Sequence, residues 1–154
     1  MNSRHMDENK NNSFNTAIKY LNQAVAYRDM KQYKNAEKYF LKIVDLFEEL
    51  ASPYSCEEYW SCLATAYSAL GVMLHDTDDT HGAQAYYLCA IDVLEGRVDA
   101  NKLEYVPNLV ACYSNLGDLT KNKECFRKAY SYAKLLPENP ICKGVIETWR
   151  DTFQ

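Results

Sequence analysis

The sequence has few of the residues that interrupt helices and none of the long apolar runs that cross membranes. It holds five glycines and four prolines among 154 residues, too few for a fold of many short strands and tight turns. No apolar run approaches the ~18 residues of a membrane span, and the polar N-terminus lacks the apolar segment of a secretory signal. The net charge of −4 gives no basic footprint for nucleic acid. We therefore expect a cytoplasmic protein with neither nucleic acid nor membrane among its partners.

Disulfide and zinc frameworks are also missing. None of the six cysteines forms a CxxC pair, and no Cys/His spacing matches a zinc motif. Cys62, Cys89, Cys112 and Cys125 lie in helical patterns where a small buried residue fits. We interpret them as reduced thiols that serve as small hydrophobic residues.

Residues for catalysis, for a metal or for a cofactor do not gather into any known pattern. No serine or cysteine has a GxSxG context, and no glycine-rich loop could hold a phosphate. The densest polar cluster is His75, Asp76, Asp78, Asp79 and His81. Such residues can bind calcium or transition metals, but the glycine and distal glutamate of a calcium loop are missing. We interpret the cluster as a turn in which Asp79 or Thr80 caps a helix, and we expect no enzyme activity, no metal and no cofactor.

What the sequence does contain is apolar periodicity typical of helices. Ser52-Pro53 should end one helix and Ser55 should cap the next, while Gly117 resembles a C-terminal cap. No segment alternates with the period of a half-buried strand. The patterns predict an all-α fold whose short turns make neighbouring helices antiparallel, with seven helices at about 14–30, 33–50, 57–76, 80–96, 101–117, 119–136 and 140–153.

One pattern of six positions recurs in three helix pairs. Apolar or aromatic residues alternate with small ones at offsets of four, three, nine, four and three residues. The best copy lies in the stretch Leu63–Val93. The three copies are Tyr20, Ala24, Tyr27, Ala36, Phe40 and Ile43; Tyr67, Gly71, Leu74, Ala83, Tyr87 and Ala90; and Val106, Val110, Tyr113, Asn122, Phe126 and Ala129.

This pattern resembles the tetratricopeptide repeat, a helix–turn–helix unit with aromatic and small residues at fixed offsets. The resemblance covers about Ala17 to Lys134 and departs from the family at Val110 and Asn122, where it prefers small residues. It implies a short right-handed α-solenoid of about three long-helix repeats, with a plain helical bundle as the structural alternative. A terminal repeat needs a cap, so residues 14–154 would form one domain closed by a capping helix at 140–153. Residues 1–13 are interpreted as a tag remnant and a disordered N-terminus.

The resemblance also implies where a partner would bind, because in this family the first helices of the pairs line a concave groove. That groove would bind a peptide or protein segment. Applied to this sequence, the groove-facing positions of the family's helices give these candidates: Leu21, Val25, Arg28, Glu58, Ser61, Thr65, Ser68, Val72, His75, Glu104, Asn108, Ala111 and Asn115. An ordinary solvated helix face stays open as the alternative. The paired lysine and asparagine with which some members clamp a C-terminal carboxylate are missing at the matching positions.

A second alternative is a self-associating scaffold domain, a homo-oligomer held by some of the thirteen tyrosines. A basic stripe, formed by Arg28, Lys31, Lys34, Lys38 and Lys42, is offset by nearby acidic residues. We interpret this stripe as a solvated convex face, with an acidic partner as the alternative.

Overall fold

Antiparallel α-helices make up the computed structural model, which describes residues 2–50 and 57–154. The described part contains seven α-helices, one 3-10 helix and no strand. The elements are α1 (Asn2–Asp29), α2 (Tyr33–Leu50), α3 (Glu57–Asp76), α4 (Thr80–Asp99), η1 (Leu103–Tyr105), α5 (Val106–Thr120), α6 (Lys123–Ala133) and α7 (Pro140–Phe153). The expected all-α fold is confirmed. The stop at Ser52-Pro53 and the cap at Ser55 lie outside the described residues.

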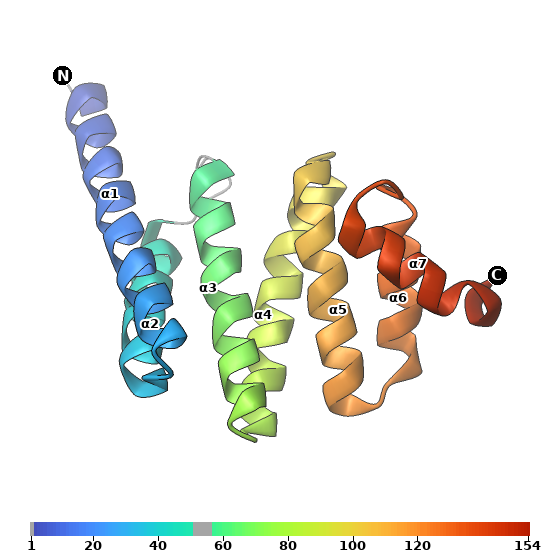
Figure 1. The fold of residues 1–154 in the computed structure, drawn as a ribbon. Helices are drawn as coiled ribbons and strands as arrows, with labels where there is room; N and C mark the ends of the chain where they lie inside the picture. Colours follow the sequence, from blue (N-terminus) through green and yellow to red (C-terminus); the bar gives the residue numbers. More distant parts are fainter. Residues whose placement is uncertain (1, 51–56) are drawn as a thin grey trace.

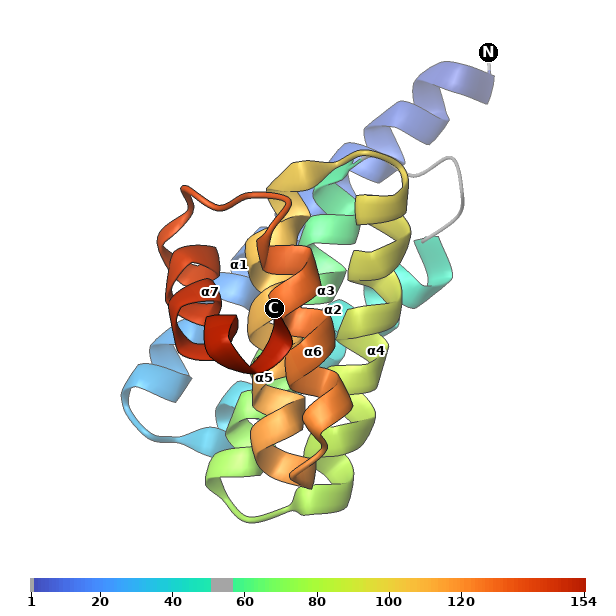
Figure 2. The ribbon, with the colours of Figure 1, turned by 90° about the vertical axis from the view of Figure 1, so that its right-hand side faces the viewer.

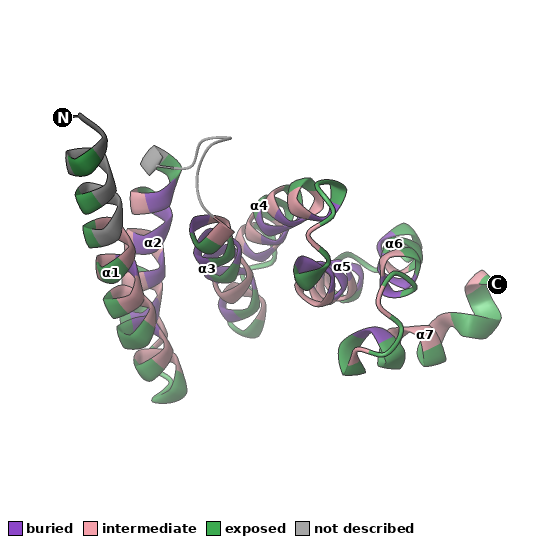
Figure 3. Ribbon diagram, turned by 90° about the horizontal axis from the view of Figure 1, so that it is seen from above, coloured by how far each residue is buried: buried purple, intermediate pink, exposed green. Residues whose placement is uncertain are grey.

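The helices stand side by side in chain order as three hairpins followed by α7 (Figure 1). In that view α1, α3 and α5 stand in front, and α2 and α4 stand behind them. Seen from above, the buried residues lie where the hairpins face one another (Figure 3). The core is therefore one continuous layer along a stack of hairpins, as the solenoid interpretation predicts.

Each hairpin turns at one residue with left-handed backbone. Lys31, Asp78 and Lys121 have φ angles of 58°, 62° and 56°, a conformation that costs a non-glycine residue roughly 1–2 kcal/mol. Caps offset part of this cost: Gly82 N–H donates to Asp79 Oδ1 at 3.0 Å, and Glu124 N–H donates to Asn122 Oδ1 at 3.0 Å. A side-chain cap stabilises a helix by about 1 kcal/mol. Asp79 as a helix cap is confirmed.

Within the hairpins, helices touch where side chains are small. A Cβ added at Gly71 would lie 2.6 Å from Cδ1 of Tyr87, and one at Gly117 would lie 2.8 Å from Cε1 of Phe126. Both distances are below any normal carbon contact. The two glycines therefore let an aromatic ring of the second helix lie directly on the backbone of the first.

The third hairpin corrects two predictions. α5 continues through Gly117 to Thr120, so Gly117 is not a cap, and Asn122 is an exposed cap instead of an inward residue. Aligning the three left-handed residues moves the third copy by one helical turn. It becomes Val110, Ser114, Gly117, Phe126, Tyr130 and Ala133.

In the corrected register the third hairpin exchanges a large and a small residue. Gly117 takes the position of Leu74, and Phe126 takes the position of Ala83. This exchange keeps the total volume nearly constant, the kind of change that a core tolerates best.

Tyrosine hydroxyls join each hairpin to the one before it. Tyr67 donates to Glu48 at 2.5 Å. Tyr113 donates to Glu95, and Tyr132 donates to the same carboxylate at 3.2 Å. Burial first, and then Glu48 or Glu95, raise the pKa of Tyr67 and of Tyr113. Both phenols therefore stay neutral donors at physiological pH.

α7 lies on the last hairpin, against α6 and partly against α5 (Figure 2). Trp149 stacks on Phe126 with ring centroids 4.6 Å apart, and Phe153 lies 5.9 Å from Tyr130. Cys142 is fully buried beneath the helix. The half-buried Trp149 thus anchors α7 on α6.

Five further expectations differ from the structure. α5 begins at Val106 instead of about 101, and α6 spans Lys123–Ala133 instead of about 119–136. α1 begins at Asn2, well before the expected start at Phe14, and α4 continues past Gly96 to Asp99. Cys89 is exposed, whereas the other cysteines expected to be buried are so. The interpretation of residues 1–13 as a tag remnant remains a prediction.

Adding one methyl group at Gly71 should destabilise the protein. Gly71→Ala places a Cβ into the ring of Tyr87, and overpacking of this kind lowers the free energy of unfolding by ~1–3 kcal/mol. Gly96→Ala is the matched control, because nothing lies within 4 Å of a Cβ there, and it should stabilise α4 by roughly 0.5–1 kcal/mol. Urea unfolding measures both, and equal effects at the two positions would contradict the close contact.

Alkaline pH should unfold the protein as the buried tyrosines ionise. Burial raises the pKa of Tyr87 from 10.0 to about 12, and burial together with the Glu95 carboxylate raises the pKa of Tyr132 to about 12. The stability from the neutral phenols is fully present below pH 10 and is lost as the pH rises through 12. Circular dichroism during urea unfolding at several pH values measures this loss. Glu95→Gln should make the free energy of unfolding depend less steeply on pH. A free energy of unfolding that stays constant between pH 10 and 12 would contradict a role for these phenols.

Candidate functional site

The first helices of the three hairpins leave a groove along one side of the stack. A hollow of about 290 Å³ lies at its centre, between α3 and α5, with α1 at its edge. Its floor is made of small residues and its walls carry hydroxyl, amide and guanidinium groups. The lining residues are Arg28, Thr65, Ser68, Ala69, Val72, Asn108, Ala111, Cys112 and Asn115.

Ser68 connects the two walls of this hollow. Its hydroxyl donates to the Ala64 carbonyl at 2.8 Å and lies 3.3 Å from Asn108 Oδ1 and 3.2 Å from Cys112 Sγ. The Asn108 oxygen therefore faces protein groups. Its amide N–H groups have no acceptor among the described residues and remain available to a ligand.

Cys112 is buried at the base of the hollow, and its thiol is expected to be unreactive. Burial raises the pKa of its thiol, and the hydrogen bond between Ser68 and Cys112 opposes this only in part. A protonated thiol is a poor nucleophile and a poor metal ligand. Cys112 therefore acts as a small wall residue.

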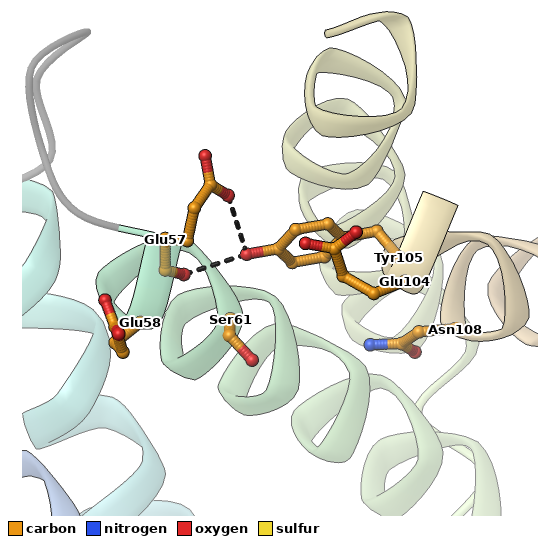
Figure 4. A pocket seen from close by; sticks show the side chains of 6 residues that line it. All are labelled: Glu57, Glu58, Ser61, Glu104, Tyr105 and Asn108. Carbon is orange, nitrogen blue, oxygen red and sulfur yellow. Dashed lines mark hydrogen bonds between the residues drawn. The ribbon is translucent and has the colours of Figure 1, made fainter. Parts of the chain in front are cut away.

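A second hollow of about 400 Å³ opens at the N-terminal end of α3, and its lining is acidic (Figure 4). Tyr105 donates from its hydroxyl to the Glu57 carbonyl at 2.8 Å and lies 3.0 Å from Glu57 Oε2. Arg97 pairs with the same carboxylate at 3.6 Å. The Glu57 carboxylate is thus engaged by Tyr105 and Arg97. The exposed residues Glu58 and Glu104 also line this hollow.

A third hollow of about 300 Å³ lies between α1 and α3 and is the most apolar of the three. It shares Glu58 and Ser61 with the acidic hollow and Thr65 with the central one. The three hollows meet along α3, so they form one groove bounded by α1, α3 and α5. We call this the α1–α3–α5 groove. The third hollow is lined by Phe14, Ile18, Leu21, Glu58, Ser61, Cys62 and Thr65.

Most of the candidates named from the sequence lie on the walls of this groove. Their role in binding remains a prediction. The residues brought together are Leu21, Arg28, Glu58, Ser61, Thr65, Ser68, Val72, Glu104, Asn108, Ala111 and Asn115.

Two candidates lie apart from the groove. Val25 is half-buried in α1 and lines none of the three hollows. His75 turns toward α4, where its Nδ1 lies 3.2 Å from the Tyr87 hydroxyl and its ring meets Tyr87 edge-on. A hydrogen bond to a buried phenol thus takes His75 away from the position that its helical offset predicts.

Several wall residues were missed by the sequence reasoning. Ala69 follows Thr65 by four positions and Cys112 follows Asn108 by four, so helical spacing alone could have added both. Tyr105 was expected inside a helix, but it ends the short η1 and reaches across to α3. Its place depends on a tertiary hydrogen bond that no local pattern encodes.

In the described ranges 2–50 and 57–154, no three His, Cys, Asp or Glu side chains gather closely enough to hold a metal ion. No helix in that part of the chain is long and apolar enough to cross a bilayer. The absence of an enzyme site, a metal and a cofactor remains a prediction.

Stacked helical hairpins with a groove along their first helices define the class of the protein, an α-helical repeat protein. Two models of the tetratricopeptide repeat match the sequence, one over residues 15–96 and one over residues 108–134. The chain belongs to the tetratricopeptide repeat family. Such repeats are generally protein–protein interaction modules. No curated protein and no solved structure matches the chain significantly.

Removing both histidines of the polar turn should not alter the metal content of the purified protein. His75 is bonded to Tyr87, and Asp79 caps α4, so two groups of the cluster already have structural roles. We expect His75→Ala/His81→Ala and the parent protein to show the same metal content by elemental analysis. Loss of a stoichiometric metal in the variant would contradict this.

Proposed function

We propose that the chain is a non-catalytic interaction module that binds an extended peptide or protein segment in the α1–α3–α5 groove. The observation that carries this proposal is the meeting of three hollows along α3. They give a continuous path past small floor residues such as Ala69 and Ala111. An extended segment needs such a path, because its backbone must come close to the helices.

Polar groups on the walls suit the backbone of a segment of this kind. The Asn108 amide can donate to a carbonyl, and Asn115, which has no hydrogen-bond partner among the described residues, can both donate and accept. Thr65 and Ser68 donate to helix carbonyls at 2.8 Å, so their oxygen lone pairs remain for N–H groups. The groove thus offers donors and acceptors at intervals along α3 and α5.

The two ends of the groove carry opposite charges. Arg28 lies beside the central hollow, whereas Glu58 and Glu104 lie at the opposite end. Among the described residues, the Arg28 guanidinium pairs with its exposed neighbour Asp29 alone, at 3.3 Å, and such a surface pair stabilises by less than about 1 kcal/mol. We propose that a bound segment places an acidic group near Arg28 and a basic group near Glu104.

The cytoplasm is the compartment we propose for this binding. The five cysteines in the described ranges are all free thiols, the state that a reducing compartment maintains. This proposal rests on the thiols alone.

A peptide library selected on the wild-type protein tests the groove. Thr65→Arg/Ser68→Arg places two long cations into the central hollow and should weaken the binding of selected peptides at least about tenfold, a change of ~1.4 kcal/mol. Ala85→Arg/Leu88→Arg is the matched control, because it adds the same charge at the same spacing on the exposed face of α4. Fluorescence anisotropy measures the affinities. Equal affinity of wild type and groove variant, or equal loss in both variants, would overturn the proposal.

A further inference from the structure

Three tyrosine pairs recur along the stack at the same sequence spacing. Each joins the first helix of a hairpin to the second. Ring centroids lie 6.0 Å apart for Tyr20 and Tyr39, 6.3 Å for Tyr67 and Tyr86, and 5.9 Å for Tyr113 and Tyr132.

The second and third pairs each lie at a junction with the preceding hairpin. There a glutamate on the preceding helix accepts from the tyrosine: Glu48 accepts from Tyr67, and Glu95 accepts from Tyr113 and Tyr132. The pair and the carboxylate together form the contact between hairpins.

The first pair has the tyrosines of such a junction but no carboxylate. No described residue accepts a hydrogen bond from Tyr20 or Tyr39, and Tyr27 stacks on Tyr39 at 5.6 Å. The Lys42 ammonium lies over both rings of the pair, 5.2 Å and 4.9 Å from their centroids. This end of the stack therefore presents half-buried aromatic rings, free hydroxyls and a cation.

A carboxylate does occur on the same surface, because Asp45 follows Lys42 by about one helical turn of α2. Asp45 is exposed and lines a hollow of about 260 Å³ together with Thr16, Tyr20, Lys42 and Leu46. Within the described ranges neither Lys42 nor Asp45 forms an ion pair. We call this surface the N-terminal edge, formed by Thr16, Tyr20, Tyr27, Tyr39, Lys42, Asp45 and Leu46.

We propose that the N-terminal edge binds the N-terminal edge of a second copy of this chain. A surface that carries both a donor group and its acceptor is complementary to itself across a two-fold axis. Asp45 of each copy then takes the place that Glu48 and Glu95 hold at the internal junctions. It accepts from Tyr20 and pairs with Lys42 of the other copy, and the tyrosine rings become buried between the two hairpins.

The assembly would stop at two copies. The opposite end of the stack is covered by α7, whose Trp149 and Phe153 pack on α6. A head-to-tail chain would need that end open, whereas a two-fold contact uses only one end and closes. This proposal does not depend on the groove function, because α1, α3 and α5 present the groove on another side of the stack.

Sedimentation equilibrium of the full chain over a range of concentrations tests the dimer. The wild type should pass from the monomer mass to twice that mass. Lys42→Glu and Asp45→Lys should each weaken the dimer roughly tenfold or more, because each sets like charges against one another. The double exchange Lys42→Glu/Asp45→Lys should dimerise more tightly than either single variant, since the two charge pairs are formed again with their signs exchanged, although position 45 then no longer accepts from Tyr20.

Lys143→Glu is the matched control, an exposed lysine on α7 at the opposite end of the stack, and it should leave the dimer unchanged. Circular dichroism melts check that each variant is folded. A wild type that stays monomeric at every concentration would overturn the proposal, as would a folded double exchange that dimerises no more tightly than the single variants. The groove variant Thr65→Arg/Ser68→Arg should dimerise normally, so failure of the groove and failure of the dimer are separately visible.

Discussion

The close approach of two helices at a glycine is the constraint on which the rest of the structure depends. At Gly71 the ring of Tyr87 lies where a Cβ would otherwise stand, and at Gly117 the ring of Phe126 does so. These contacts fix the distance between the two helices of a hairpin. Since the first helices must then stand in a row, the spacing within hairpins also determines that α1, α3 and α5 share one side of the stack.

Hydrogen bonds between hairpins determine how the row is arranged. Tyr67 binds Glu48, Tyr113 binds Glu95, and Tyr105 binds Glu57. The last of these ties the beginning of α5 to the beginning of α3 and forms a wall of the acidic hollow. Neutral phenols with a raised pKa act here as rigid donors between helices, and buried donors of this kind are costly to leave unpaired.

The groove follows from these two levels of packing. Helix faces turned away from the glycine contacts carry small and polar side chains, so hollows remain between neighbouring first helices. The Asn108 oxygen lies against Ser68 and Cys112, and its N–H groups have no acceptor among the described residues. The proposed interaction surface thus consists of residues that the core does not need.

Much of this fold could be predicted from the sequence, because apolar periodicity and turn residues are local signals. The first two copies of the repeat, the cap at Asp79 and the final helix from Pro140 follow directly from them. Most groove residues could also be named, since helical offsets determine which residues share a face.

The rest depended on contacts between distant residues. Gly117 fits both a helix end and a close packing contact, and only the position of Phe126 decides between them. His75 has the right offset for the groove, yet the Tyr87 hydroxyl draws it to α4. Tyr105 reaches the groove through a bond to α3 that no local pattern contains.

Nuclear magnetic resonance of the isotope-labelled protein with a bound peptide tests most directly whether a partner lies in the α1–α3–α5 groove. We expect the side-chain amide signals of Asn108 and Asn115 to shift on binding, together with backbone signals of α3 facing them. Shifts confined to α2, α4 and α6, with both amides unchanged, would contradict binding in the groove.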